Sequence, residues 1–208
     1  MTVVVIQPVS GNDLSIIAQI HIRAFPESAL TKLGFEAVYR YYDWQLTGPH
    51  ESFSTIAIDN QQIVGFCFGG VFHGAMGGFL RKNQLFLVRH VIIRPWLLFN
   101  ELFRSRVVSA LRSLKITRRK KNQFIAASTN KPKSYGILSI AVDPQIQSRG
   151  IGRALMQAAE NDAIEKGFEQ MHLTVSPKNM QATNFYLGLG WVKNGDPWAG
   201  AMIKHLKY

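Results

Sequence analysis

The spacing of apolar residues in the first part of the chain predicts one strand followed by two helices. The predicted elements are a β-branched strand at 3–6, a helix at 14–25 and a second helix at 34–47. Ser10 to Asp13 supply capping residues before the first helix, and Pro26 ends it because proline does not continue a helix. Gly48-Pro49 closes the second helix in the same way.

Two longer apolar runs then predict an antiparallel hairpin. They cover 54–59 and 62–72, and Asp59-Asn60-Gln61 lies between them as a turn. The chain therefore has the order β-α-α-β-β up to Phe72.

Regular elements resume after residue 133. The predicted elements are strands at 136–142 and 171–176, helices at 149–167 and 181–188, and a last strand at 201–206. The segment between the two halves, 73–133, interrupts this pattern with a glycine-rich stretch, an apolar-basic stretch and a predicted helix from Leu97 to Lys115.

The composition favours one soluble globular domain over 1–208, with 73–133 inserted in it. The chain has 208 residues, of which 47% are hydrophobic and 18% charged, and this excludes a disordered or collagen-like chain. The single cysteine, Cys67, cannot form an internal disulfide, and the first residues lack the features of a secretory signal. The longest uncharged run, 60–80, holds six glycines and makes a poor membrane span. We therefore expect a cytoplasmic protein.

Basic residues are concentrated in the inserted segment. Residues 81–133 contain 14 Lys and Arg but one acidic residue, Glu101, within a chain of net charge +11. In a purely structural interpretation, these basic residues form the solvated face of a packed helix. The alternatives are a site for an anionic acceptor and a peripheral contact of 81–133 with an acidic membrane surface. Nucleic acid ranks last because no recognition motif is present.

The most informative motif follows the strand at 136–142. The run Gln147-Ser148-Arg149-Gly150-Ile151-Gly152 places two glycines where a strand turns into a helix. The unpaired amides and the positive end of such a helix can hold a pyrophosphate. Neither the glycine-lysine pattern of a P-loop nor the three-glycine pattern of a dinucleotide-binding fold occurs here.

These residues resemble the signature of the GNAT superfamily of acetyl-CoA-dependent N-acetyltransferases, in which Q/R-x-x-G-x-G/A follows a strand. A second signature of the family is matched by Asn179, Ala182, Phe185-Tyr186 and Gly190-Trp191. The chain is also similar to GNAT proteins encoded with cell-surface polysaccharide genes, through Phe25-Pro26 and Leu33-Gly34-Phe35.

The resemblance implies an α/β GNAT fold with a mixed, mostly antiparallel sheet that is splayed at 137–142. It also implies direct acetyl transfer from acetyl-CoA to an amine, with no metal. The residues that match the coenzyme contacts of the family are Ile140, Ala141, Val142, Ser148, Arg149, Gly150, Ile151, Gly152, Arg153 and Asn179. Tyr186 matches the general acid, and a phenol of pKa about 10 suits protonation of a departing thiolate.

The general base remains open. The glutamate that some members carry is replaced by Thr174, and no acidic residue occurs from Ser134 to Val142. The candidates are His73, His90, His172 and bulk water, the last for a weakly basic amine such as an amino sugar.

Each functional role has a structural alternative. Tyr186 would also suit a core aromatic, Asn179 a helix cap, and Cys67 a small core residue. The alternative for the whole chain is a non-catalytic acyl-CoA-binding or scaffold protein that has lost its base. The sequence predicts neither the acceptor nor the oligomeric state.

Overall fold

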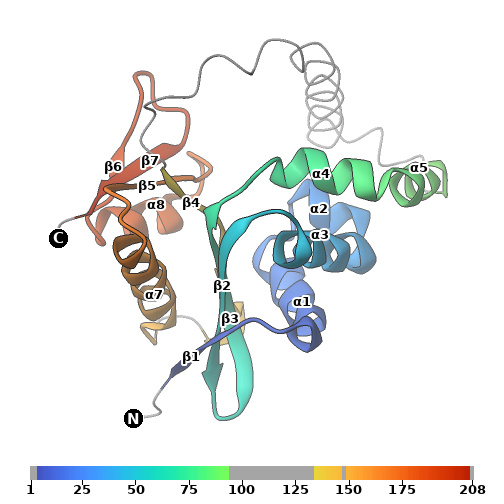
Figure 1. Cartoon of the computed structure of the whole chain (residues 1–208), viewed down its shortest axis with the longest axis horizontal. Helices are drawn as coiled ribbons and strands as arrows, with labels where there is room; N and C mark the ends of the chain where they lie inside the picture. The colour runs from blue at the N-terminus through green and yellow to red at the C-terminus, as the bar shows by residue number, and fades with distance from the viewer. Residues whose placement is uncertain (1–3, 94–133, 147–148, 207–208) are drawn as a thin grey trace.

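The computed structural model describes residues 4–93, 134–146 and 149–206, and Figure 1 shows the arrangement of their elements. The strands are β1 (Val5–Pro8), β2 (Glu51–Asp59), β3 (Gln62–Val71), β4 (Tyr135–Val142), β5 (Gln170–Thr174), β6 (Val192–Lys193) and β7 (Ala201–His205). The helices are α1 (Leu14–Ala24), α2 (Ala29–Leu33), α3 (Phe35–Thr47), α4 (Ala75–Lys82), α5 (Gln84–Ile93), α7 (Ile151–Glu165) and α8 (Met180–Leu187).

The strands form one seven-stranded sheet in the order β1-β2-β3-β4-β5-β7-β6. Every neighbouring pair is antiparallel except β4 and β5, which run parallel because helix α7 connects them as a crossover. Helices α1 to α5 lie on one side of the sheet, and α7 and α8 lie on the other (Figure 1). The predicted α/β fold with a mixed, mostly antiparallel sheet is confirmed.

Each face of the sheet has its own hydrophobic core. Leu155 and Met156 of α7 pack with Tyr186 of α8 on one face. Ile17 of α1 and Tyr42 of α3 pack with Phe66 of β3 on the other. We call these faces the α7–α8 face and the α1–α3 face. Cys67 is fully buried on the α7–α8 face, as expected of a small core residue, and burial raises the pKa of its thiol to about 12.

The structure agrees with the predicted strands and helices to within a few residues at their ends. It adds α2, α5 and β6, which are too short or too uniformly apolar to show a clear period. It also adds α4 in the glycine-rich stretch, where Gly78 is required because a side chain there would collide with the ring of Trp44. The predicted helix from Leu97 to Lys115 lies outside the described residues.

Within the described ranges, no helix combines the length and the hydropathy that a membrane-spanning segment needs.

Candidate active site

Strands β4 and β5 separate shortly after they begin. Only two pairs join them, Tyr135 with Met171 and Gly136 with His172. On its other side β4 stays paired with β3, but a bulge opposite Phe68 and Gly69 leaves Leu138 as an extra residue. Beyond Gly136 the β5-facing edge of β4 therefore borders a gap, which confirms the predicted splay at 137–142.

The glycine turn at the start of α7 leaves an open helix N-terminus. Gly150 is the N-cap with φ +77°, a left-handed conformation that favours glycine, and no atom lies within 4 Å of where its Cβ would be. The first amide to donate along the helix is that of Ala154, to the Gly150 carbonyl oxygen at 3.0 Å. The amides of Ile151, Gly152 and Arg153 precede it, so they have no carbonyl one turn back within the helix.

Two ion pairs anchor the loop that carries this turn. The carboxylate of Asp143, at the end of β4, lies 2.6 Å from the Arg23 guanidinium of α1. Arg149 lies 3.4 Å from the buried carboxylate of Asp59 in the β2–β3 hairpin. Arg153 is exposed and Ser148 lies outside the described residues. The loop is thus held by α1 and by the β2–β3 hairpin.

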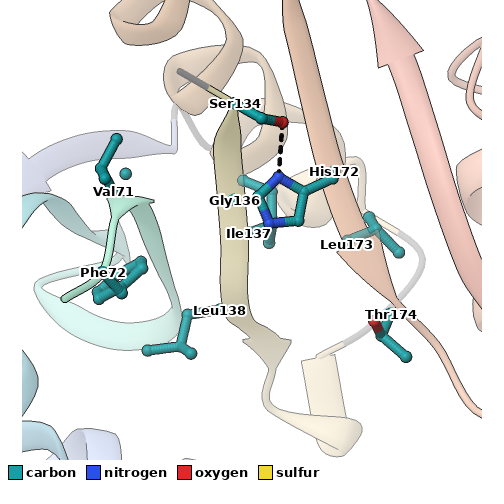
Figure 2. A pocket seen from close by; sticks show the side chains of 10 residues that line it. Val71, Phe72, Ser134, Gly136, Ile137, Leu138, His172, Leu173 and Thr174 are labelled. Carbon is teal, nitrogen blue, oxygen red and sulfur yellow. Dashed lines mark hydrogen bonds between the residues drawn. The ribbon is translucent and has the colours of Figure 1, made fainter. Parts of the chain in front are cut away.

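A cavity of about 400 Å³ occupies the start of the gap (Figure 2). Val71, Phe72 and Leu138 form apolar walls, while Ser134 and His172 provide polar groups. His172 and Thr174 alternate along β5 with Met171 and Leu173, which are buried on the α7–α8 face. Both side chains therefore point toward the α1–α3 side of the sheet.

Hydrogen bonds hold the His172 ring in this cavity. Its Nδ1 lies 2.8 Å from the Ser134 hydroxyl, as the dashed line in Figure 2 shows. Partial burial lowers the pKa of the imidazole, and a hydrogen bond with the Tyr135 backbone opposes part of that shift. A neutral ring can accept a proton, so His172 retains the chemistry of a base.

The other two histidines proposed as bases do not line the cavity. His73 lies 3.7 Å from the carboxylate of Glu51, and both side chains are more than half exposed. His90 packs against Phe86 within α5, with the two rings tilted and their centroids 4.3 Å apart. Of the three candidates, His172 alone lines the gap between β4 and β5.

Tyr186 lies on the α7–α8 face, across the sheet from the side chains of His172 and Thr174. Its ring packs edge-on against Phe185 and Trp191, with centroids 5.2 and 6.0 Å away. Burial raises the pKa of the phenol, so the hydroxyl stays protonated at neutral pH. The packing fits a core aromatic, and the protonated hydroxyl keeps the capacity of a general acid.

Asn179 has a local role in the structure. It is the N-cap of α8, and its side-chain oxygen accepts a hydrogen bond from the Ala182 amide at 3.0 Å. The structural alternative considered for this residue is therefore present, and among the described residues no hydrogen bond of the side-chain NH₂ group is observed.

The sequence did not point to a third group of polar residues beside the gap. Ser139 of β4 lies 2.9 Å from the Tyr42 hydroxyl of α3, which lies 2.8 Å from Nδ1 of His21 in α1. His21 and Tyr42 are buried, and burial lowers the pKa of His21 to about 4. A histidine on the apolar stripe of the first helix is the one signal in the sequence that could have found them.

Comparison with known proteins agrees with this geometry. A model of the family described as "Acetyltransferase (GNAT) family" matches residues 14–191. No curated protein matches the chain in sequence.

Several solved structures share the fold. The PaiA N-acetyltransferase of Thermoplasma acidophilum, in complex with coenzyme A, is 12% identical, with a TM-score of 0.58 over 98% of this chain and 99% of that chain. A GNAT family acetyltransferase from Brucella melitensis, in complex with acetyl-CoA, is 14% identical, with a TM-score of 0.55 over 99% and 90%. An Escherichia coli N-acetyltransferase of a ribosomal-protein alanine is 15% identical, with a TM-score of 0.56 over 99% and 96%.

Proposed function

The chain belongs to the acetyltransferase (GNAT) family, and from this premise we propose that it binds acetyl-CoA in the gap between β4 and β5 and transfers the acetyl group directly to an amine. The observation that carries the proposal is the presence of two backbone edges. One is the β5-facing edge of β4 from Ile137 to Ala141, and the other is the N-terminus of α7 at Gly150. An extended amide-containing chain can pair with the first, and a pyrophosphate can bind the second.

The predicted coenzyme contacts fit this arrangement. Ile140, Ala141 and Val142 belong to the splayed part of β4. The open space at Gly150 and the amides of Ile151, Gly152 and Arg153 suit a phosphate group. Arg149 adds positive charge, which Asp59 partly offsets at 3.4 Å. Ser148 and the side-chain amide of Asn179 complete the proposed set of coenzyme contacts.

The two faces of the gap suit different steps of the transfer. We assign the protonation of the departing thiolate to Tyr186, on the α7–α8 face. The amine would enter from the α1–α3 side, through the cavity lined by His172 and Ser134. This separation suits direct transfer, because the amine adds to the carbonyl carbon while the acid protonates the thiolate sulfur as it departs from the tetrahedral intermediate.

The acceptor is proposed to be an amine on a polar, anionic molecule, such as a nucleotide- or lipid-linked amino sugar. The cavity combines two hydrogen-bonding side chains with apolar walls, and the basic residues of 81–133 would attract an anion. The resemblance to GNAT proteins encoded with polysaccharide genes agrees with this class of acceptor.

The acetyltransferase activity is tested by measuring the release of CoA thiol from acetyl-CoA in the presence of a panel of amines. The panel contains putrescine, glucosamine, glucosamine 6-phosphate and a peptide with a free amino terminus, and binding of acetyl-CoA is measured by calorimetry. We expect micromolar to millimolar binding and amine-dependent release of CoA. Binding without thiol release from any amine would favour the alternative, a non-catalytic acyl-CoA-binding or scaffold protein.

Helix α5 supports a second proposal, that the protein binds peripherally to an acidic membrane surface. Leu85, Val88 and Ile92 occupy one face of α5 and are 83%, 58% and 72% exposed. Basic residues lie at positions 81, 82 and 89. Exposed apolar residues beside cations suit the interface of an anionic bilayer.

Vesicle co-sedimentation tests this contact. Wild-type protein should bind vesicles with 30% phosphatidylserine at low salt and lose binding at high salt. The double substitution Leu85→Ser and Ile92→Ser should weaken binding, whereas Val192→Ser, at an equally apolar exposed site on β6, should not. Equal binding of all three proteins would exclude α5 as the contact.

A further inference from the structure

A continuous chain of polar groups leads from the gap into the α1–α3 core. It begins at the Ser139 hydroxyl, passes through the Tyr42 hydroxyl at 2.9 Å, and reaches Nδ1 of His21 at 2.8 Å. On the other side of the ring, Nε2 of His21 lies 3.3 Å from the Ser28 hydroxyl. Three separate elements and the α1–α2 turn therefore contribute to one hydrogen-bonded path.

The far end of this path determines which group donates at each step. The Phe25 carbonyl oxygen can only accept, so the Thr31 hydroxyl, 2.7 Å away, must donate its proton to it. The Ser28 hydroxyl then donates to Thr31 at 2.9 Å. Because the Ser28 proton is used there, Nε2 of His21 must carry the proton that it shares with Ser28.

The same reasoning continues toward the gap. A neutral imidazole with its proton on Nε2 has a lone pair on Nδ1, so Tyr42 donates its hydroxyl proton to His21. Tyr42 can then only accept from Ser139. The Ser139 oxygen has given away its one proton, and it therefore presents only lone pairs to any other group.

Ser139 lies on the splayed part of β4. It is half-buried in β4, next to Leu138 of the cavity wall and past the last β4–β5 pair at Gly136. Its hydrogen bond to Tyr42 places it on the α1–α3 side, across the sheet from Tyr186. The amine-side and thiol-side groups thus lie on opposite faces.

We propose that Ser139 accepts the proton of the attacking amine and that Tyr42 and His21 act as positioning residues that hold it as an acceptor and relay the charge. This proposal rests on the proposed acetyl transfer. As the new C–N bond forms, the amine N–H proton passes to Ser139, the Ser139 proton to Tyr42, and the Tyr42 proton to Nδ1 of His21. After the amide leaves, the proton returns along the path to water in the gap.

The path is surrounded by neutral groups at Tyr42, and the charged residues next to Ser28 and Thr31 are Glu27 and Lys32, which form an ion pair at 2.7 Å. The titratable groups that interact with Tyr42 are Tyr41 on α3 and Cys67 on β3, and burial raises the pKa of both. Burial is the cause of the low proton affinity of His21. Burial disfavours the imidazolium, so in the proposed relay His21 holds the proton only transiently and returns it toward Ser139.

Kinetics of Tyr42→Phe and Ser139→Ala test the relay with the fastest amine of the panel. Each variant should lower kcat roughly 10²-fold at pH 7, with unchanged affinity for acetyl-CoA. The deficit should shrink as pH rises, because hydroxide replaces the relay as proton acceptor. The double variant should lose no more than either single variant, since both break the same path.

Tyr41→Phe is the matched control. Tyr41 is a neighbouring buried tyrosine for which no hydrogen bond of the hydroxyl is observed among the described residues, and it should keep wild-type kcat. The relay would be overturned if the loss of kcat in Tyr42→Phe and Ser139→Ala did not change with pH, or if Tyr41→Phe lost as much kcat. If kcat no longer depended on pH in His172→Gln but still did in Tyr42→Phe, the base would be His172 and not the relay. No thiol release by the wild type would instead refute the acetyl transfer itself.

Nitrogen-15 NMR of the histidine rings tests the path without any substrate. The proposal requires His21 to carry its proton on Nε2 at pH 7, with Nδ1 unprotonated. A proton on Nδ1 would reverse every donor toward the gap and overturn the proposal, even if the substituted proteins did not fold.

Discussion

Lowering the pH should destabilise the folded protein through His21. The ring is buried, and burial lowers its pKa from 6.5 to about 4. In the unfolded chain the ring binds a proton near pH 6.5, so the unfolded state gains protons first as the pH falls. The stabilising contribution is complete above pH 6.5 and is lost progressively toward pH 4.

The size of the effect follows from these two values. Between pH 7.5 and pH 5, preferential protonation of unfolded His21 should cost about 2 kcal/mol, at about 1.4 kcal/mol for each pH unit below 6.5. With a urea m-value of about 2 kcal/mol/M, the unfolding midpoint should fall by about 1 M.

Urea unfolding of the wild type and of His21→Gln separates this residue from all other groups. Gln is neutral at both pH values. Between pH 7.5 and pH 5 the free energy of unfolding of the variant should therefore fall by about 2 kcal/mol less than that of the wild type. Other histidines and carboxylates contribute equally to both proteins and cancel. Equal pH dependence of the two proteins would show that His21 titrates normally in the folded state, and the reasoning from burial would be wrong.

Three substitutions test the proposed site. Tyr186→Phe should lower kcat roughly 10²-fold, or about 2.7 kcal/mol, and leave the affinity for acetyl-CoA unchanged in calorimetry. Gly150→Val should abolish acetyl-CoA binding, because a β-branched residue at φ +77° distorts the turn and fills the space next to the amides. Gly136→Ala should raise the KM for the amine and spare acetyl-CoA affinity, because the new Cβ would lie 2.9 Å from Nε2 of His172 and displace the ring.

Matched variants distinguish these effects from general damage. Tyr135→Phe removes a hydroxyl that donates to Asp162 at 2.9 Å, so it should lower stability but not kcat. Gly74→Val places the same side chain at another left-handed helix N-cap with open space, and it should keep acetyl-CoA affinity. Normal turnover in Tyr186→Phe, normal affinity in Gly150→Val or a normal amine KM in Gly136→Ala would each contradict the assigned role.

Local interactions made much of this protein predictable from its sequence. Apolar spacing located the main strands and helices, because residues three or four apart share a helix face and alternate residues share a strand face. The turn at Gly150 and the cap at Asn179 also depend on residues close in sequence, so both were recognisable before the structure.

The tertiary structure alone decided which distant polar residues meet. Ser139 and Tyr42 are 97 positions apart and His21 and Tyr42 are 21 apart, so no periodic pattern links them. Their contact depends on the packing of α1 and α3 against the sheet and on the bulge at Leu138. The same packing separates His172 from His73 and His90, which the sequence could not rank. Helix and strand propensities act over a few residues, whereas the register of a sheet and the docking of a helix bring together residues from the whole chain.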